Sequence, residues 1–236
     1  MTFNEIGRPP IEGELNTNEF VKTKYGLVLL KRIPKDNPSI LDAIATEYGS
    51  IGFFDEGGYF RRRSFQDQLD LSENASFYDL RVLLPIEAID QVIYYPYLES
   101  AVNYEEFLKS ASAEEAEDIV LQEFDDLRSA HNKGIVYGDR WPPNILVIPT
   151  IGLVNIDFDI ELLGVPAVEF EVAQVVFYTL ASGKEKVIQI LKSIINQSDG
   201  WFNYSLFAKF LKGHGNLFAS DPKYGDLRKQ ITTLLN

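Results

Sequence analysis

Three polar residues near the middle of the chain have the types and the spacing that phosphoryl transfer requires. Asp139 and Asn144 are five positions apart in a short segment, and Asp157 follows a pair of apolar runs. A carboxylate can orient or deprotonate an acceptor hydroxyl, whereas carboxylate and amide oxygens hold Mg²⁺ against phosphates. We therefore expect Asp139 to act on an acceptor, and Asn144 and Asp157 to bind Mg²⁺.

A helix is expected to lead into this segment. Ser112 and Glu115 have the spacing of a capping box, and apolar residues continue along one helical face as far as Ala130. Gly134 then ends the helix, because glycine is favoured just after a helix terminus. Asp139 should therefore lie on the loop that follows.

A hairpin is expected to follow the loop. The apolar runs at residues 145–148 and 153–156 flank a turn that contains Pro149 and Gly152. Such a hairpin presents its flanking polar residues at one edge. We therefore expect Asp157 to lie beside the loop of Asp139.

The rest of the chain changes character near Glu99. Strand-like runs precede it and helical periodicity follows it. The pattern predicts an α+β fold in two parts, residues 1–98 and 99–236. Strands are expected at residues 25–33, 80–84 and 91–95, and helices at residues 39–48, 171–181, 184–196 and 204–211.

The central stretch is similar to the catalytic loop of protein kinases and their relatives. Asp139, four intervening residues and Asn144 match that loop, and Asp157-Phe158 matches the metal-binding motif. The family's preceding His and Gly and its loop proline are matched by His131, Gly134 and Pro142. The resemblance implies a two-lobed fold with ATP as the phosphate donor. Its small β-rich N-lobe would be residues 1–98, and its larger helical C-lobe residues 99–236.

Several positions resemble compact, atypical members of that superfamily. Gly138 precedes the catalytic Asp as in aminoglycoside-type phosphotransferases, while Tyr137 and Trp141 stand where protein kinases have His and Lys. Eleven residues separate Asp157 from Glu169, a shortened activation segment that resembles those of RIO-like and KEOPS-complex kinases. Glu169 falls where kinases place an Asp that braces the catalytic loop.

The resemblance also assigns an ATP-binding Lys to the first part of the chain. Lys31 ends a strand-like run similar to the kinase strand whose Lys neutralises the α- and β-phosphates. Its Glu partner would be Glu47, on the helix expected at residues 39–48, or Glu73. A surface Lys on an edge strand is the plainer interpretation of Lys31.

Residues 92–100 resemble the hinge between kinase lobes. The carbonyl of Pro96 and the N–H of Leu98 would contact adenine there, because proline keeps its acceptor but lacks a donor.

A glycine-rich stretch offers an alternative phosphate site, since no Gly-x-Gly-x-x-Gly pattern precedes Lys31. In this alternative the following strand supplies an Arg in place of Lys31, whereas a plain hairpin turn is the simpler account of the glycines. The residues concerned are Gly49, Gly52, Gly57 and Gly58, the strand at 59–65, and Arg61 or Arg63.

The composition of the chain excludes several kinds of partner and of chemistry. The formal net charge of −13 argues against a nucleic-acid partner, and the absence of cysteine excludes disulfides and cysteine catalysis. No apolar run reaches the roughly 20 residues of a membrane span, and the start lacks a secretory pattern, so we expect a cytoplasmic protein without a membrane partner.

The expected function is therefore that of an atypical protein-kinase-like phosphotransferase, which uses ATP and Mg²⁺ and a protein or small-molecule hydroxyl acceptor. A pseudokinase that serves as a binding or scaffold module, and an aminoglycoside-type phosphotransferase, are the alternatives.

Overall fold

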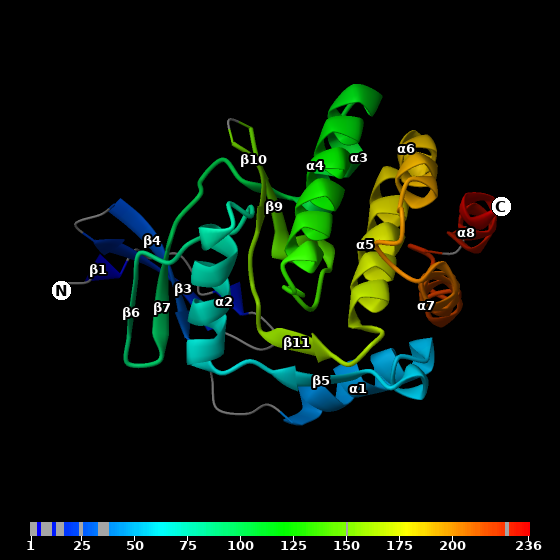
Figure 1. Ribbon diagram of the computed structural model, residues 1–236. Helices are drawn as coiled ribbons and strands as arrows, with labels where there is room; N and C mark the ends of the chain where they lie inside the picture. Colours follow the sequence, from blue (N-terminus) through cyan, green and yellow to red (C-terminus); the bar gives the residue numbers. More distant parts are fainter. Residues whose placement is uncertain are drawn as a thin grey trace.

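A computed structural model describes residues 4–5, 11–12, 17–23, 26–32, 38–149, 151–224 and 227–236 of the chain. Most strands lie in the first half of the chain, and helices dominate the second half (Figure 1). The strands are β1 (Asn4–Glu5), β2 (Ile11–Glu12), β3 (Thr17–Thr23), β4 (Gly26–Arg32), β5 (Tyr59–Arg62), β6 (Glu87–Ile89), β7 (Val92–Pro96), β8 (Val102–Asn103), β9 (Ile145–Ile148), β10 (Gly152–Asn155) and β11 (Ile160–Leu163). The helices are α1 (Pro38–Ile51), α2 (Phe65–Phe77), α3 (Tyr104–Ser110), α4 (Ala113–Asn132), α5 (Ala167–Gly183), α6 (Glu185–Asn196), α7 (Tyr204–Leu217) and α8 (Leu227–Leu235), with short 3₁₀ helices η1 (Phe54–Glu56) and η2 (Pro142–Asn144).

An antiparallel sheet forms the amino-terminal side of the molecule (Figure 1). Its strands follow the order β1-β3-β4-β7-β6, and β2 also pairs with β3. Val28 and Leu30 of β4 are buried on one face. Because side chains alternate along a strand, Lys31 leaves β4 on the opposite face, where it is only 4% exposed. The sheet therefore presents a buried ammonium group away from its own small core.

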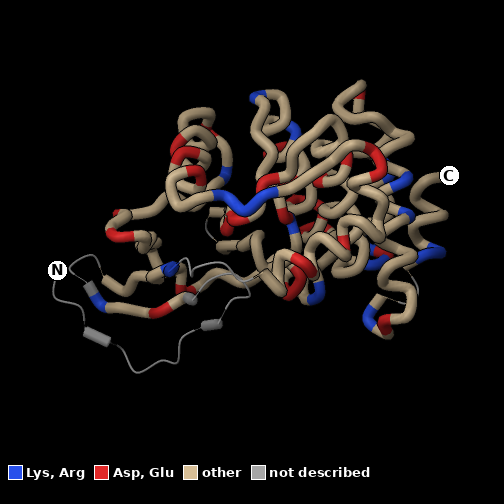
Figure 2. Tube along the Cα trace, turned by 90° about the horizontal axis from the view of Figure 1, so that it is seen from below, with Lys and Arg blue, Asp and Glu red and all other residues tan. Residues whose placement is uncertain are grey.

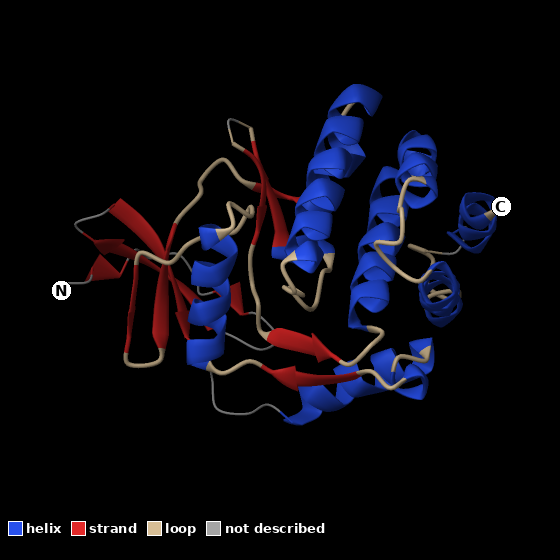
Figure 3. Ribbon diagram, in the orientation of Figure 1, coloured by secondary structure: helices blue, strands red, loops and turns tan. Residues whose placement is uncertain are grey.

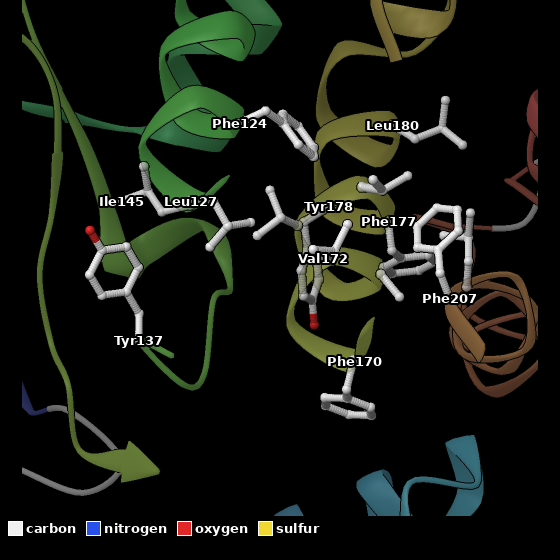
Figure 4. Close-up of a cluster of buried hydrophobic side chains, with 14 of the residues drawn as sticks. Phe124, Leu127, Tyr137, Ile145, Phe170, Val172, Phe177, Tyr178, Leu180 and Phe207 are labelled. Atoms are coloured by element: carbon white, nitrogen blue, oxygen red, sulfur yellow. The ribbon is translucent and has the colours of Figure 1, made fainter. Parts of the chain in front are cut away.

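Helix α5 is the centre of the helical part. Nearly all of its residues are buried, and it contacts α3, α4, α6, α7 and α8. A helix that is apolar on every side must be surrounded by other elements. Figure 3 shows α3 to α8 gathered on the carboxyl-terminal side, and Figure 4 shows Val172, Phe177 and Leu180 of α5 among side chains of α4 and α7. The loop of Asp139 thus rests on a rigid helical base.

The hairpin expected after that loop is present. Strands β9 and β10 pair antiparallel, with Ile145 opposite Asn155, and β8 pairs with β9. The Ile156 N–H donates to the Asn144 carbonyl at 2.9 Å, which closes the open end of the hairpin. Asn144 and Asp157 therefore leave the hairpin side by side.

Residues 38–63, here called the inserted segment, leave the amino-terminal sheet and join the helical part (Figure 1). Helix α1 packs on α7, and β5 pairs antiparallel with β11. Gly213 of α7 permits the close approach, because a Cβ there would lie 2.7 Å from the Ile51 carbonyl oxygen. Tyr48 and Phe53 pack on Phe170 of α5, with ring centroids 4.8 and 4.4 Å apart. Part of residues 1–98 therefore belongs spatially to the helical part.

The α+β class expected from the sequence is confirmed, with small antiparallel sheets and many helices. The strands expected at 25–33 and 91–95 are β4 and β7, although Tyr25 and Ile33 lie outside the described residues, as does Thr150 in the hairpin turn. The expected helices are all present, and α5 and α7 are longer than expected.

The strand expected at residues 80–84 is wrong. Val82 makes only an isolated parallel bridge to Asn155, and the Leu83 N–H donates to the Asn155 carbonyl at 3.0 Å. The run is apolar because Leu80 is buried in the main core, not because it belongs to a sheet.

No helix in the described part of the chain is both long enough and apolar enough to cross a membrane. Figure 2 shows acidic residues distributed over most elements, in keeping with the net charge of −13.

Candidate functional site

Glu171 of α5 braces the loop that carries Asp139. Its Oε1 accepts a hydrogen bond from the Gly138 N–H at 2.6 Å, and its Oε2 lies 2.5 Å from His131 Nε2. Glu169, which we expected to brace the loop, instead accepts from the Asn203 N–H at 2.9 Å. The bracing carboxylate is therefore two residues further along α5 than expected.

Asp139 receives donors from two elements. Gln174 Nε2 donates to Asp139 Oδ1 at 2.7 Å, while Gln174 Oε1 accepts from the Arg140 N–H at 2.7 Å. The hydroxyl of Tyr48, in α1, donates to the same Oδ1 at 3.3 Å. The carboxylate expected to act on an acceptor is thus oriented by both α5 and the inserted segment.

Gly138 has a steric reason for standing before Asp139. Its φ is +112°, and a Cβ built on it would lie 1.8 Å from the Ile160 carbonyl oxygen. Only glycine fits this contact between the loop and β11. The Arg that precedes the Asp in ordinary protein kinases has no room here.

Arg140 ties the loop of Asp139 to the turn of Asp157. Its buried guanidinium donates to the carbonyls of Asn144 (3.1 Å), Ile156 (3.0 Å) and Asp157 (3.2 Å), and to Asn155 Oδ1 (3.1 Å). Several charged donors on one rigid fork fix the relative position of the two segments.

Tyr137, which stands where protein kinases have His, is a buried structural residue. Its hydroxyl donates to Asp126 Oδ2 at 2.7 Å, and Asn155 Nδ2 donates to the same oxygen at 3.1 Å. The Arg81 N–H donates to Asp126 Oδ1 at 2.7 Å. The network joins α4, the loop and β10.

Arg63 links the inserted segment to the site. Its guanidinium donates to the carbonyls of Val136 (2.8 Å), Tyr137 (2.6 Å), Phe158 (3.2 Å) and Ile160 (2.7 Å). Burial lowers the pKa of Arg63 to about 10, so the group stays charged at neutral pH. Arg63 therefore holds residues 136–137 of the loop against residues 158–160.

The alternative in which an Arg replaces Lys31 is wrong. Gly49 lies inside α1, and β5 pairs with β11 instead of joining the sheet of Lys31. Arg63 is engaged by backbone carbonyls, and Arg61 forms an ion pair with Glu161.

Lys31 meets the residues that follow the hairpin. Its Nζ forms an ion pair with Asp157, lies 2.8 Å from Asp159 Oδ1 and donates to Gln68 Oε1 at 3.2 Å. The side chains of Lys31 and Asp159 are each 5% exposed, whereas that of Asp157 is 36% exposed. The fold thus joins two predicted site residues that are 126 positions apart.

The partner of Lys31 is not the expected one. Gln68 of α2 supplies a neutral amide, and the second carboxylate comes from Asp159. Glu73 is exposed on α2. Glu47 lies on α1, where burial, Asp139 and Glu47 together raise the pKa of Tyr48 well above its ordinary value. Among the described residues, the side chains that bind Lys31 do not include Glu47.

The charges of this cluster are interdependent. Burial opposes the charge of Lys31, but the carboxylates of Asp157 and Asp159 outweigh it and raise the pKa of Lys31. Burial and Asp159 raise the pKa of Asp157 to about 6, although Lys31 lowers it. Two carboxylates around one ammonium leave a net negative charge at neutral pH, which suits a cation.

Asn144 and Asp157 fit a magnesium site. Asn144 Nδ2 donates to the Asp139 carbonyl at 2.9 Å, which leaves the amide oxygen as the ligand atom. Asp157 is partly exposed and has a φ of +59°. No group of three His, Cys, Asp or Glu gathers around a metal position within the described ranges. Magnesium in phosphate sites is held by one or two carboxylates together with phosphates and water, so two protein ligands are sufficient.

Pro96 is the last residue of β7, next to the strand of Lys31, and Leu98 lies two positions further on. Pro96 pairs in register with Val28, and Leu98, which is partly exposed, accepts from the Ala101 N–H at 3.1 Å. Their contact with adenine stays a prediction.

A pocket of about 450 Å³ lies between α2 and β11. Its walls include Asp67, Leu71, Glu161 and Val168, and they do not include the predicted site residues. Arg63 borders it, so the pocket adjoins the site without being part of it.

Some residues of the candidate site were not predicted from the sequence, although the sequence of α5 carries a signal for two of them. Glu171 and Gln174 are polar residues at i and i+3 in a largely apolar helix, and such a pair on one buried face needs polar partners. Tyr48 and Gln68 carry no comparable signal, because their partners are remote in sequence, and Arg63 was expected only as a phosphate-binding residue.

Neither a protein-family model nor a curated protein sequence matches this chain.

Proposed function

We propose that this protein is an ATP-dependent phosphotransferase with a compact, two-lobed, protein-kinase-like fold. The ion pair between Lys31 and Asp157 carries the proposal. It joins a Lys from the sheet to a carboxylate beside the loop of Asp139 and Asn144, the set of groups that phosphoryl transfer to a hydroxyl needs.

The roles follow from the chemistry of each group. Lys31 neutralises charge on the nucleotide phosphates, and Asn144 and Asp157 hold Mg²⁺. The ion supplies charge neutralisation when it is bound. Asp139 accepts the hydrogen bond of the acceptor hydroxyl and takes its proton. The acceptor is a hydroxyl compound, either a protein or a small molecule, and Pro96 and Leu98 contact the adenine.

Calorimetry with ATP tests the binding step. We expect ATP to bind more tightly with Mg²⁺ than without it, and Asp157→Asn to remove that difference. Asp118→Asn, an exposed change on α4, is the matched control. If neither ATP nor GTP binds at millimolar concentration with Mg²⁺ or Mn²⁺, the proposal is overturned.

Release of ADP tests turnover. A positioned base contributes about 10²- to 10⁴-fold in rate, so Asp139→Asn should slow ADP release by that factor and leave ATP affinity nearly unchanged. The melting temperature of the variant controls for loss of fold. Binding without turnover in the unmodified protein would indicate a pseudokinase.

A further inference from the structure

The inserted segment brings an additional side chain to Asp139. Tyr48 is 2% exposed, and its hydroxyl donates to Asp139 Oδ1 at 3.3 Å. We propose that Tyr48 is a positioning residue that holds the Asp139 carboxylate in the orientation needed for transfer. The inference rests on the proposed phosphotransferase function.

Two donors fix the carboxylate at one oxygen. Gln174 Nε2 and the Tyr48 hydroxyl both donate to Oδ1, from α5 and α1 respectively. Rotation of the carboxylate about its Cβ–Cγ bond would break both hydrogen bonds. The direction of the second oxygen is thereby set, and misplacement of a reacting group by about 1 Å can cost as much as about a hundredfold in rate.

Tyr48 is itself held rigidly. Its ring packs edge-on against Phe53, Phe60 and Phe170, with centroids 6.0, 5.4 and 4.8 Å away. Burial, Asp139 and Glu47 raise its pKa, so the hydroxyl remains a donor at neutral pH. A buried aromatic ring with its hydroxyl at a carboxylate is suited to orientation, because neither partner is free to move.

The inserted segment is also fixed close to Asp139 at two other places. Strand β5 pairs with β11, against which Gly138 packs, and Arg63 donates to the carbonyls of Val136 and Tyr137 in the loop of Asp139. Nine residues separate Asp157 from α5, so this part of the chain has little length with which to support Asp139. The inserted segment supplies that support from the other side.

Tyr48→Phe tests the inference, with Tyr104→Phe as the matched control. Tyr104 is 1% exposed and its hydroxyl lies 3.1 Å from Thr179 Oγ1, so both variants lose one buried hydroxyl. With ATP and Mg²⁺, we expect Tyr48→Phe to lower kcat for ADP release about ten- to a hundredfold, the effect of losing one hydrogen bond to a charged group. KM for ATP and the calorimetric ATP affinity should change less than twofold. Tyr104→Phe should leave all three unchanged.

A second comparison separates positioning from general structural damage. In the Asp139→Asn background the oriented carboxylate is gone, so adding Tyr48→Phe should reduce the rate little further. If Tyr48→Phe turns over like Tyr104→Phe, or if its effect is equally large in the Asp139→Asn background, the inference is wrong and the phosphotransferase proposal stands. If the unmodified protein binds ATP without turnover, both fail.

Discussion

Lys31 is held by charges that come from a single turn of the chain. Asp157 and Asp159 lie two positions apart and both reach its ammonium group, while α2 contributes the neutral Gln68. The negative charge around Lys31 therefore comes from this turn alone, and the neighbouring helix contributes a neutral hydrogen-bond acceptor.

Asp159→Asn should destabilise the protein by roughly 2 kcal/mol, because a buried charged group loses one of its partners. Gln68→Glu in that background should recover part of the loss, since Gln68 Oε1 is already 3.2 Å from Lys31 Nζ. Urea unfolding of the single and double variants measures both effects. A double variant no more stable than Asp159→Asn would show that Gln68 does not occupy the position of the missing carboxylate.

Glu123 gives the stability a distinctive pH dependence. Its side chain is fully buried, and burial together with Asp126 raises its pKa from 4.5 to about 8. Above pH 4.5 the unfolded chain ionises Glu123 while the folded chain keeps the proton, so this group lowers the unfolding free energy as pH rises towards 8. The slope is about 1.4 kcal/mol per pH unit.

Glu123→Gln removes this contribution, since an amide does not titrate. We expect its stability relative to the unmodified protein to improve steadily from pH 5 to pH 8. Glu117→Gln, an exposed change on the same helix, should show no such trend. Chemical unfolding at several pH values provides the measurement, and a difference that does not vary with pH would contradict the assignment.

At the scale of elements, the contact between the loop of Asp139 and β11 determines how closely the parts of the candidate site approach. Gly138 lies against the Ile160 carbonyl, and Arg63 donates to that same carbonyl. Strand β11 is held in turn by β5 of the inserted segment. The loop of Asp139 therefore packs on β11, and β11 pairs with β5. Gly138 sets the distance between the loop and β11.

Gly138→Ala should cost on the order of 3 kcal/mol or more, because its Cβ would overlap the Ile160 carbonyl oxygen at 1.8 Å. Gly134→Ala is the matched control. Its φ is also positive, at +73°, but no described atom lies within 4 Å of the added Cβ. We expect it to cost only about 1 kcal/mol, the price of a left-handed conformation. If urea unfolding shows that both variants lose the same unfolding free energy, then the backbone conformation, and not the close contact, determines the loss in each.

At the scale of the whole molecule, the two parts of the chain are interleaved. The sheet of β1 to β4, β6 and β7 comes from residues before 97, yet α1 and β5, from the same stretch, pack with α5, α7 and β11. The rings of Tyr48 and Phe53 lie against Phe170. A cut at residue 98 would therefore expose the surface that α1 covers.

A fragment of residues 99–236 should fail to form a native core, whereas a fragment of residues 38–236 should keep one, because only the longer fragment retains the inserted segment. Near-ultraviolet circular dichroism and thermal unfolding distinguish the two. A cooperative transition in the shorter fragment would show that the helical part folds without α1 and β5.

The sequence alone determined the elements whose signals are local. Ser112 and Glu115 make the capping box at the start of α4, and the two apolar runs form the hairpin of β9 and β10. The loop between α4 and β9 carries Asp139. Asn144 and Asp157 were expected at one end of that hairpin, and the backbone bond from Ile156 to Asn144 places them there. These features depend on helix capping, on the alternation of apolar and polar residues and on turn-forming residues, each within about twenty residues. Such short-range features can be predicted from the order of residues alone.

Only the tertiary structure decided which remote side chains complete the site. Lys31 and Asp157 are 126 positions apart, Tyr48 and Asp139 are 91 apart, and Arg63 and Tyr137 are 74 apart. The contacts of Tyr48 and Arg63 depend on the path of the inserted segment, and that path is set by the packing of α1 on α7 and the pairing of β5 with β11. The contact of Lys31 depends instead on where the amino-terminal sheet lies relative to the turn of Asp157. The burial of aromatic side chains and the pairing of strands join segments that have already formed. For that reason no local pattern identified Tyr48 or Gln68, Arg63 was considered only as a replacement for Lys31, and neither Glu47 nor Glu73 is the partner of Lys31.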